Sequence, residues 1–173
     1  MKPILSICAA MVLLGCGKKA PEQQAKPKVE LTEAKLTPGI EAALKADEAG
    51  NYREAARLYT VELAAEEAKS APSWVQLSHL HNELGTALDN AGLYDKALEH
   101  CQKSLAIDLK QLGLEHPDVA ASYNNIGAVH DSKGEFNKAL EHYQKALAIR
   151  LKKLGPNHLD TKDTEAELDA LKE

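Results

Sequence analysis

The sequence predicts an all-α fold built from stacked helical hairpins. Two observations support this prediction: the chain resembles itself at a spacing of 42 residues, and apolar residues recur at three- and four-residue steps inside each repeated unit. The composition agrees with it, because the 173 residues include 1 Phe and 1 Trp but many Ala, Leu, Glu and Lys, which favour helices over strands. The length suits one domain with a leader and a tether.

The repeat is clearest between residues 78–119 and 120–161, which are identical at 20 of 42 aligned positions. Its strongest block is Lys-Ala-Leu-Glu-His, at 96–100 and again at 138–142. Identity at nearly half of the positions predicts one structural unit used twice. A first, degraded copy lies at about 36–77.

Each unit divides into two amphipathic helices. In the last full unit we expect one helix over Val119 to Ser132, a chain reversal at Gly134, and a second helix over Asn137 to Leu154. Neither helix can bury its apolar face alone, so the units must stack on one another. After Asp160, residues 161–173 read as one polar helix that caps the stack.

Small and aromatic residues take fixed places in the repeats. The last full repeat carries Tyr123, Ile126, Gly127, His130, Ala139, Tyr143 and Ala146. The middle repeat carries, at the same places, His81, Leu84, Gly85, Leu88, Ala97, Cys101 and Ser104. These slots resemble the tetratricopeptide repeat family, and the 42-residue period with the Leu-Gly-x-x-His-Pro-Asp loop at 112–118 is most similar to the long variant of kinesin light chains. The resemblance implies a helical-hairpin solenoid of about 2.5 to 3 repeats over 36–173, with repeats at about 36–77, 78–119 and 120–161.

The slot residues also predict how each hairpin packs. We expect Gly85 with Ser104, and Gly127 with Ala146, to let the two helices of a hairpin approach each other. In the degraded first repeat, Gly39 and Ala42 stand where bulky residues are usual, and Glu62 stands where a small residue is usual. Its first helix is therefore expected to be weak.

The N-terminus has the layout of a secretory signal. A charged start is followed by an apolar run that is too short to span a bilayer. Leu13-Leu14-Gly15-Cys16 resembles the lipobox of bacterial lipoproteins, which implies a signal peptide over 1–15 and a lipid on Cys16. Residues 16–35 are rich in Pro, Gln and charge and are expected to form a flexible tether. Gly17 stands where the family's inner-membrane signal has Asp, which favours the outer membrane of the bacterial envelope. The alternative is a plain secretory signal.

Composition and motifs argue against several classes of function. The net charge of −5, with no basic stripe, disfavours nucleic acid. The 7 histidines include no His-Glu-x-x-His pair. His100 and His142 are repeat equivalents, so the repeat explains them better than a metal site does. Cys101 occupies a core slot and is expected to pack as a small hydrophobe. We therefore expect no catalytic residue, no metal and no cofactor, and we do not expect an enzyme.

In the tetratricopeptide family the first helices of the hairpins line a concave groove that receives a peptide or a partner's helix. The resemblance implies groove positions at His79, Asn82, Glu83, Thr86, Asp89, Ala121, Asn124, Asn125, Ala128 and Asp131. An Asn amide both donates and accepts, so Asn82 and Asn124 suit a peptide backbone. Alternatively, these asparagines are polar residues on a solvated face.

Acidic residues gather on or near the same face: Glu41, Asp47, Glu83, Asp89, Asp131, Asp163 and Glu167. Charge complementarity then favours a neutral or basic partner segment. The predicted function is a membrane-anchored scaffold that binds a partner protein in envelope complex assembly, with self-association through an array end as a further expectation. A regulatory accessory subunit of an envelope enzyme is the alternative, and a catalyst in its own right is the third class.

Overall fold

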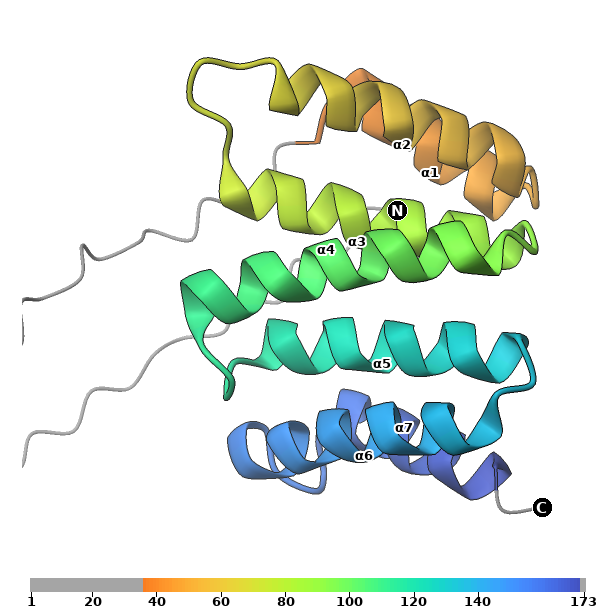
Figure 1. Ribbon diagram of the computed structural model, residues 1–173, viewed down its shortest axis with the longest axis vertical. Coiled ribbons are helices and arrows are strands. Elements are labelled where there is room, and N and C mark those ends of the chain that lie inside the picture. The colour runs from red at the N-terminus through yellow and green to blue at the C-terminus, as the bar shows by residue number, and fades with distance from the viewer. Residues whose placement is uncertain (1–35, 172–173) are drawn as a thin grey trace, which may run out of the picture. The chain divides into compact units, whose positions relative to one another are not determined.

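The computed structural model describes residues 36–171, which form seven helices and no strand. The helices stack in chain order along the long axis, from α1 and α2 at one end to α6 and α7 at the other (Figure 1). Their bounds are α1 Pro38–Glu48, α2 Tyr52–Glu67, α3 Trp74–Asn90, α4 Tyr94–Leu112, α5 Pro117–Ser132, α6 Phe136–Lys153 and α7 Leu159–Ala170. The predicted all-α solenoid of helical hairpins is thus confirmed.

The expected signal peptide, Cys16 and tether lie outside the described residues. Within residues 36–171, no helix is long and apolar enough to cross a membrane.

The ends of the last hairpin follow from local chemistry. α5 begins at Pro117 rather than at the predicted Val119, because a proline fits the first turn of a helix, where the missing N–H costs nothing. The side chain of His116 caps this end by accepting a hydrogen bond from the Asp118 amide, at 3.2 Å. The chain reverses at Gly134, whose φ of 78° favours glycine. α6 begins at Phe136, one residue before the predicted start.

Packing inside the hairpins corrects one prediction. A Cβ on Gly127 would lie 2.7 Å from Cδ1 of Tyr143, and a Cβ on Gly85 would lie 2.4 Å from Sγ of Cys101. Tyr143 and Cys101, not Ala146 and Ser104, therefore use the space that the glycines leave. The expected partners lie three residues further along their helix, about 4.5 Å along its axis. There Ser104 pairs with the hydroxyls of Ser78 and Ser122, and Ala146 packs in one cluster with Val119 and Ala120.

The first hairpin compensates for its unusual residues. Gly39 leaves room for Glu62, since a Cβ at position 39 would overlap the Glu62 carboxylate. Thr37 caps α1 by accepting from the amide of Ile40 at 3.1 Å and donates to Glu62 at 2.6 Å. The two departures from the repeat pattern thus fit each other, and the helix that we expected to be weak forms with a cap.

α7 is the last helix that the structure describes. It begins at Leu159 and ends at Ala170, so it starts slightly before the predicted cap at 161. Leu168, 6% exposed, packs in one cluster with Tyr143. Asp169 stands in α7 where the repeat register has Gly127 in α5. The side chain at this position distinguishes α7 from α3 and α5, which have glycine there.

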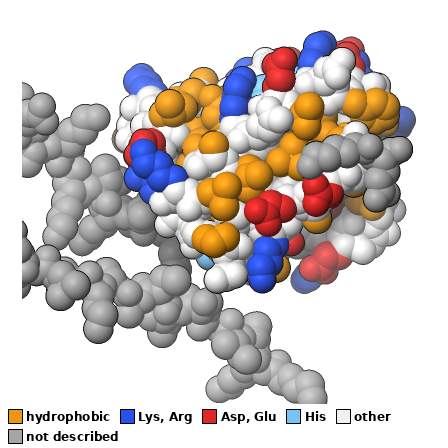
Figure 2. Space-filling model, turned by 90° about the horizontal axis from the view of Figure 1, so that it is seen from below, with side chains coloured by type: hydrophobic (Ala, Val, Ile, Leu, Met, Phe, Trp, Pro, Cys, Tyr) orange, Lys and Arg blue, Asp and Glu red, His pale blue; other side chains and the backbone are white. Residues whose placement is uncertain are grey.

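The α6–α7 end of the stack carries exposed apolar side chains. Figure 2, which looks onto this end, shows hydrophobic side chains in a broken band between acidic and basic ones. Large exposed hydrophobics of these two helices are Phe136, Leu151 and Leu159, at 57%, 40% and 69%. Self-association through this end stays a prediction.

Candidate binding face

The first helices of successive hairpins share one surface, here called the inner face, formed by α1, α3, α5 and α7. Side-chain hydrogen bonds join its neighbouring helices. Asn125 of α5 donates to Asn82 of α3 at 2.8 Å, and Ser132 of α5 donates to Asp89 of α3 at 3.2 Å. Asn124 donates to Glu167 of α7 at 3.2 Å. Polar contacts thus fix the spacing of the helices that would carry a binding site.

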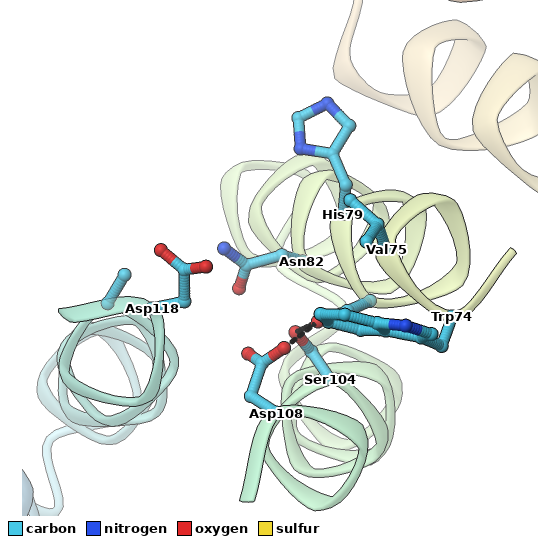
Figure 3. Close-up of a pocket in the computed structure, with 9 residues that line it drawn as sticks. Trp74, Val75, His79, Asn82, Ser104, Asp108 and Asp118 are labelled. Carbon is cyan, nitrogen blue, oxygen red and sulfur yellow. Dashed lines mark hydrogen bonds between the residues drawn. The ribbon is translucent and has the colours of Figure 1, made fainter. Parts of the chain in front are cut away.

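The structure separates the two asparagines that the repeat makes equivalent. The amide of Asn124 lies between α5, α6 and α7, where its oxygen accepts from Arg150 at 3.2 Å and from Thr164 at 3.1 Å. Asn82 instead points into a pocket between α3 and α5 (Figure 3). The amide of Asn124 is held by bonds from α6 and α7, whereas Asn82, whose oxygen accepts from Asn125, also lines the pocket.

The other predicted groove residues lie on the inner helices as well. His79 approaches Glu83 of the same helix, with Nδ1 and Oε1 3.8 Å apart. Asp89 accepts from Ser132, and Asp131 lies close enough to raise the pKa of the Asp89 carboxyl, a smaller effect than that of burial. Contact of these residues with a partner stays a prediction.

Carboxylates of the inner face are partly withdrawn from water. Burial raises the pKa of Asp47, Asp89 and Glu167 above the ordinary values. One buried oxygen of each accepts no hydrogen bond from the described residues. Tyr59, which is fully buried, has a hydroxyl without a partner, and its pKa is raised by burial and then by the nearby Glu83 and Asp47.

A pocket of about 210 Å³ opens between α3, α4 and α5 (Figure 3). Its lining comes from the first turns of α3 and α5 and the last turns of α4, and includes Trp74, Val75, Ser78, His79, Asn82, Ser104, Asp108, Asp118 and Ala121. Sequence reasoning anticipated His79, Asn82 and Ala121 as groove residues. It missed Trp74 and Asp108.

Asp108 is the most deeply placed charge of this pocket. It is 4% exposed, and its two carboxylate oxygens accept from the hydroxyls of Ser78 at 2.5 Å and Ser122 at 2.8 Å. Burial raises the pKa of Asp108, and the two serine bonds oppose that rise. A carboxylate on the apolar side of a predicted helix was the signal in the sequence.

Several histidines lie in close pairs among residues 36–171, and the cysteine is buried. No group of three or more His, Cys, Asp or Glu side chains there is placed to hold a metal ion. His81 and His100 share a hydrogen bond between their Nδ1 atoms, at 2.9 Å, and the rings of His130 and His142 stack with centroids 5.4 Å apart. Cys101 is fully buried, as predicted, and burial raises the pKa of its thiol to about 12.

The comparisons with known proteins agree with this architecture. Residues 76–152 match the family model described as tetratricopeptide repeat. These residues are tetratricopeptide repeats. A comparison with curated proteins found no match.

Several solved structures resemble the tetratricopeptide array. A putative kinesin light chain with nearly identical repeats, from Podosopora anserina, is 26% identical with a TM-score of 0.69, over 77% of this chain and 63% of that one. BtubC (BKLC) from P. vanneervenii is 23% identical with a TM-score of 0.65, over 75% of this chain and 51% of that one. The chain therefore spans less than two thirds of the length of either protein. The predicted likeness to kinesin light chain repeats is confirmed.

A third structure is the second tetratricopeptide domain of human RPAP3, solved with the HSP70 peptide SGPTIEEVD. It is 17% identical with a TM-score of 0.55, over 78% of this chain and 92% of that one. At this identity the likeness concerns the fold alone.

Proposed function

We propose that the inner face binds a basic segment of a partner protein and that the chain acts as a scaffold. The observation that carries this is the charge of the two central inner helices: α3 and α5 contain no Lys or Arg, but they contain Glu83, Asp89, Asp118 and Asp131. The tetratricopeptide fold is consistent with a protein-binding scaffold, since such repeats are generally binding modules and not enzymes.

The acidic character of the inner face disfavours an acidic partner segment. The peptide bound by the RPAP3 domain contains two Glu and one Asp, with no Lys or Arg. The face described here is acidic, so charge complementarity favours the opposite class of segment.

Binding should respond to charge on the inner face and to salt. We expect the double variant Asp89→Asn, Asp131→Asn to bind a fluorescent Arg- and Lys-containing peptide at least about tenfold more weakly, a loss of about 1.4 kcal/mol. Binding should also weaken from low to physiological salt, because exposed charges are screened. Fluorescence anisotropy with the purified chain measures both effects.

The matched control is Asp95→Asn, Glu99→Gln, which removes the same charge from exposed positions of α4. It should leave the affinity nearly unchanged. Tighter binding of a Glu-rich peptide of equal length than of the basic one would contradict the proposed charge preference.

The scaffold would work at the bacterial envelope, anchored through a lipid on Cys16, with the outer membrane favoured. The run Leu13-Leu14-Gly15-Cys16 supports this placement. Cells that make the chain should incorporate labelled palmitate into it, and Cys16→Ser should lose both the label and the membrane association. Incorporation of the label into the Cys16→Ser variant would refute lipidation at Cys16. Assembly of envelope complexes is the favoured role; co-purification with one envelope enzyme would favour the accessory-subunit alternative.

A further inference from the structure

The pocket between α3, α4 and α5 has the size of one side chain. Its volume of about 210 Å³ is below the roughly 300–1,000 Å³ that small-molecule sites usually need. It opens on the inner face, where His79 and Asn82 belong to its lining. A side chain that projects from a segment bound on that face would therefore reach it.

Asp108 places an uncompensated charge in this pocket. Within the part of the chain that the structure describes, no ion pair includes Asp108, although it is 4% exposed. The serine bonds use one acceptor position on each oxygen, and a carboxylate oxygen can accept a second. Burying an ionised carboxylate without a cation is costly. A cationic ligand would therefore gain the most binding free energy beside Asp108.

The remaining lining suits a flat cation. Figure 3 shows the Trp74 indole edge-on beside Ser104 and Asp108, while Asn82 and Asp118 approach from the other side of the pocket. A guanidinium group is planar, stacks on aromatic faces and is weakly hydrated, whereas an ammonium is a compact, strongly hydrated charge. Arginine fits such a site better than lysine does.

The next repeat of the same chain shows a guanidinium held at the equivalent place. Arg150 stands 42 residues after Asp108 in the repeat register. It is 9% exposed and donates to Asn124 Oδ1 at 3.2 Å, to the Asp160 carbonyl oxygen at 3.0 Å and to Thr164 Oγ1.

The partners of Arg150 have direct equivalents around the pocket. Asn124, Asp160 and Thr164 correspond, residue by residue, to Asn82, Asp118 and Ser122. The middle repeat thus keeps the groups that surround a guanidinium, but it carries Asp108 where the last repeat supplies the guanidinium itself. The equivalent space in the middle repeat is the pocket.

We propose that this pocket receives the guanidinium group of an arginine from the partner segment. The guanidinium pairs with the Asp108 carboxylate and stacks against the Trp74 indole. This rests on the proposed binding of a basic segment to the inner face, and it names the residue that the segment must contain. Asp108 and Trp74 then determine specificity, while the carboxylates along the rest of the face contribute a general attraction.

Trp74 provides the readout, because it is the 1 Trp of the chain. The full chain is titrated with N-acetyl-arginine amide, with its uncharged isostere N-acetyl-citrulline amide, and with N-acetyl-lysine amide, while the tryptophan fluorescence is followed. We expect a saturable change with the arginine probe, with a dissociation constant on the order of millimolar for a single side chain. The citrulline probe should give no saturable change.

The variant Asp108→Asn should weaken the arginine probe at least about tenfold. Its urea midpoint should not fall below that of the unchanged protein, because the variant removes a buried charge while an amide still hydrogen-bonds to the serines. The matched control is Glu141→Gln, an exposed change of equal charge on α6, outside the inner face, which should bind as the unchanged protein does.

Three results would overturn the arginine pocket: an equal response to citrulline, an equal or tighter response to lysine, or full binding by a folded Asp108→Asn variant. If basic peptides bind the inner face but the arginine probe does not change the tryptophan fluorescence, the arginine pocket is refuted and the proposed scaffold function is not. If the arginine probe binds but no basic peptide does, the pocket recognises arginine and the proposed binding of a basic segment to the inner face is refuted.

Discussion

Replacing Tyr143 by Ala should lower the free energy of unfolding by about 3–5 kcal/mol, the range for removing a buried aromatic ring. Tyr143 is 2% exposed, fills the space opposite Gly127 and belongs to the cluster that includes Leu168 of α7. A single domain is stable by about 5–15 kcal/mol, so the loss would be a large share of the total. Urea unfolding followed by circular dichroism measures it.

The control for this prediction is Tyr143→Phe, which keeps the ring and removes the hydroxyl. It should cost less than about 1 kcal/mol, since the packing against Gly127 is preserved. If Tyr143→Ala costs no more than Tyr143→Phe, then the ring does not hold α5, α6 and α7 together as the structure indicates.

The second large effect is on the pH dependence of stability. Burial, and then the neighbouring His100 and Lys103, lower the pKa of His81 from 6.5 to about 4. Since the folded protein resists protonation of this ring more than the unfolded chain does, stability is full above pH 6.5. It is lost as the pH falls toward 4, by about 3 kcal/mol at roughly 1.4 kcal/mol per pKa unit.

His81→Tyr should remove most of this loss. Tyr123 takes the equivalent place in the last repeat and lies beside His142, with ring centroids 6.0 Å apart, so a tyrosine is a proven occupant of this slot. Free energies of unfolding, measured for both proteins at about pH 7.5 and about pH 4, give the comparison. The value of the variant at the higher pH reports any damage to packing.

Burial raises the pKa of Asp47, Asp89, Asp108 and Glu167, which acts in the opposite direction: their cost to stability is present at neutral pH and disappears as the pH falls. For that reason the test is the difference in pH dependence between the unchanged protein and His81→Tyr, and not the pH dependence of either protein alone. Identical pH dependence in both would refute the assignment.

Local patterns in the sequence determined the helices, their order and their stacking. The 42-residue repeat and the apolar spacing predict three hairpins with a cap, and Gly134 marks the chain reversal between α5 and α6. The prediction placed the start of α5 at Val119, although Pro117 marks it through backbone chemistry. The burial of Cys101 follows from its slot in the repeat. These features are predictable because each depends on residues close to one another in the chain.

Only the tertiary structure decided what the repeats do with one another. Which side chain faces Gly85 or Gly127 depends on how two helices are offset along their axes, and that offset leaves no trace in the spacing of either helix. Asn82 and Asn124 are equivalent in sequence, yet Arg150 occupies the space beside one and a pocket lies beside the other. Asp108 of α4 accepts hydrogen bonds from Ser78 of α3 and Ser122 of α5, which belong to different hairpins. Such a site forms only when helices of two successive repeats pack together, which is why periodicity alone cannot predict it.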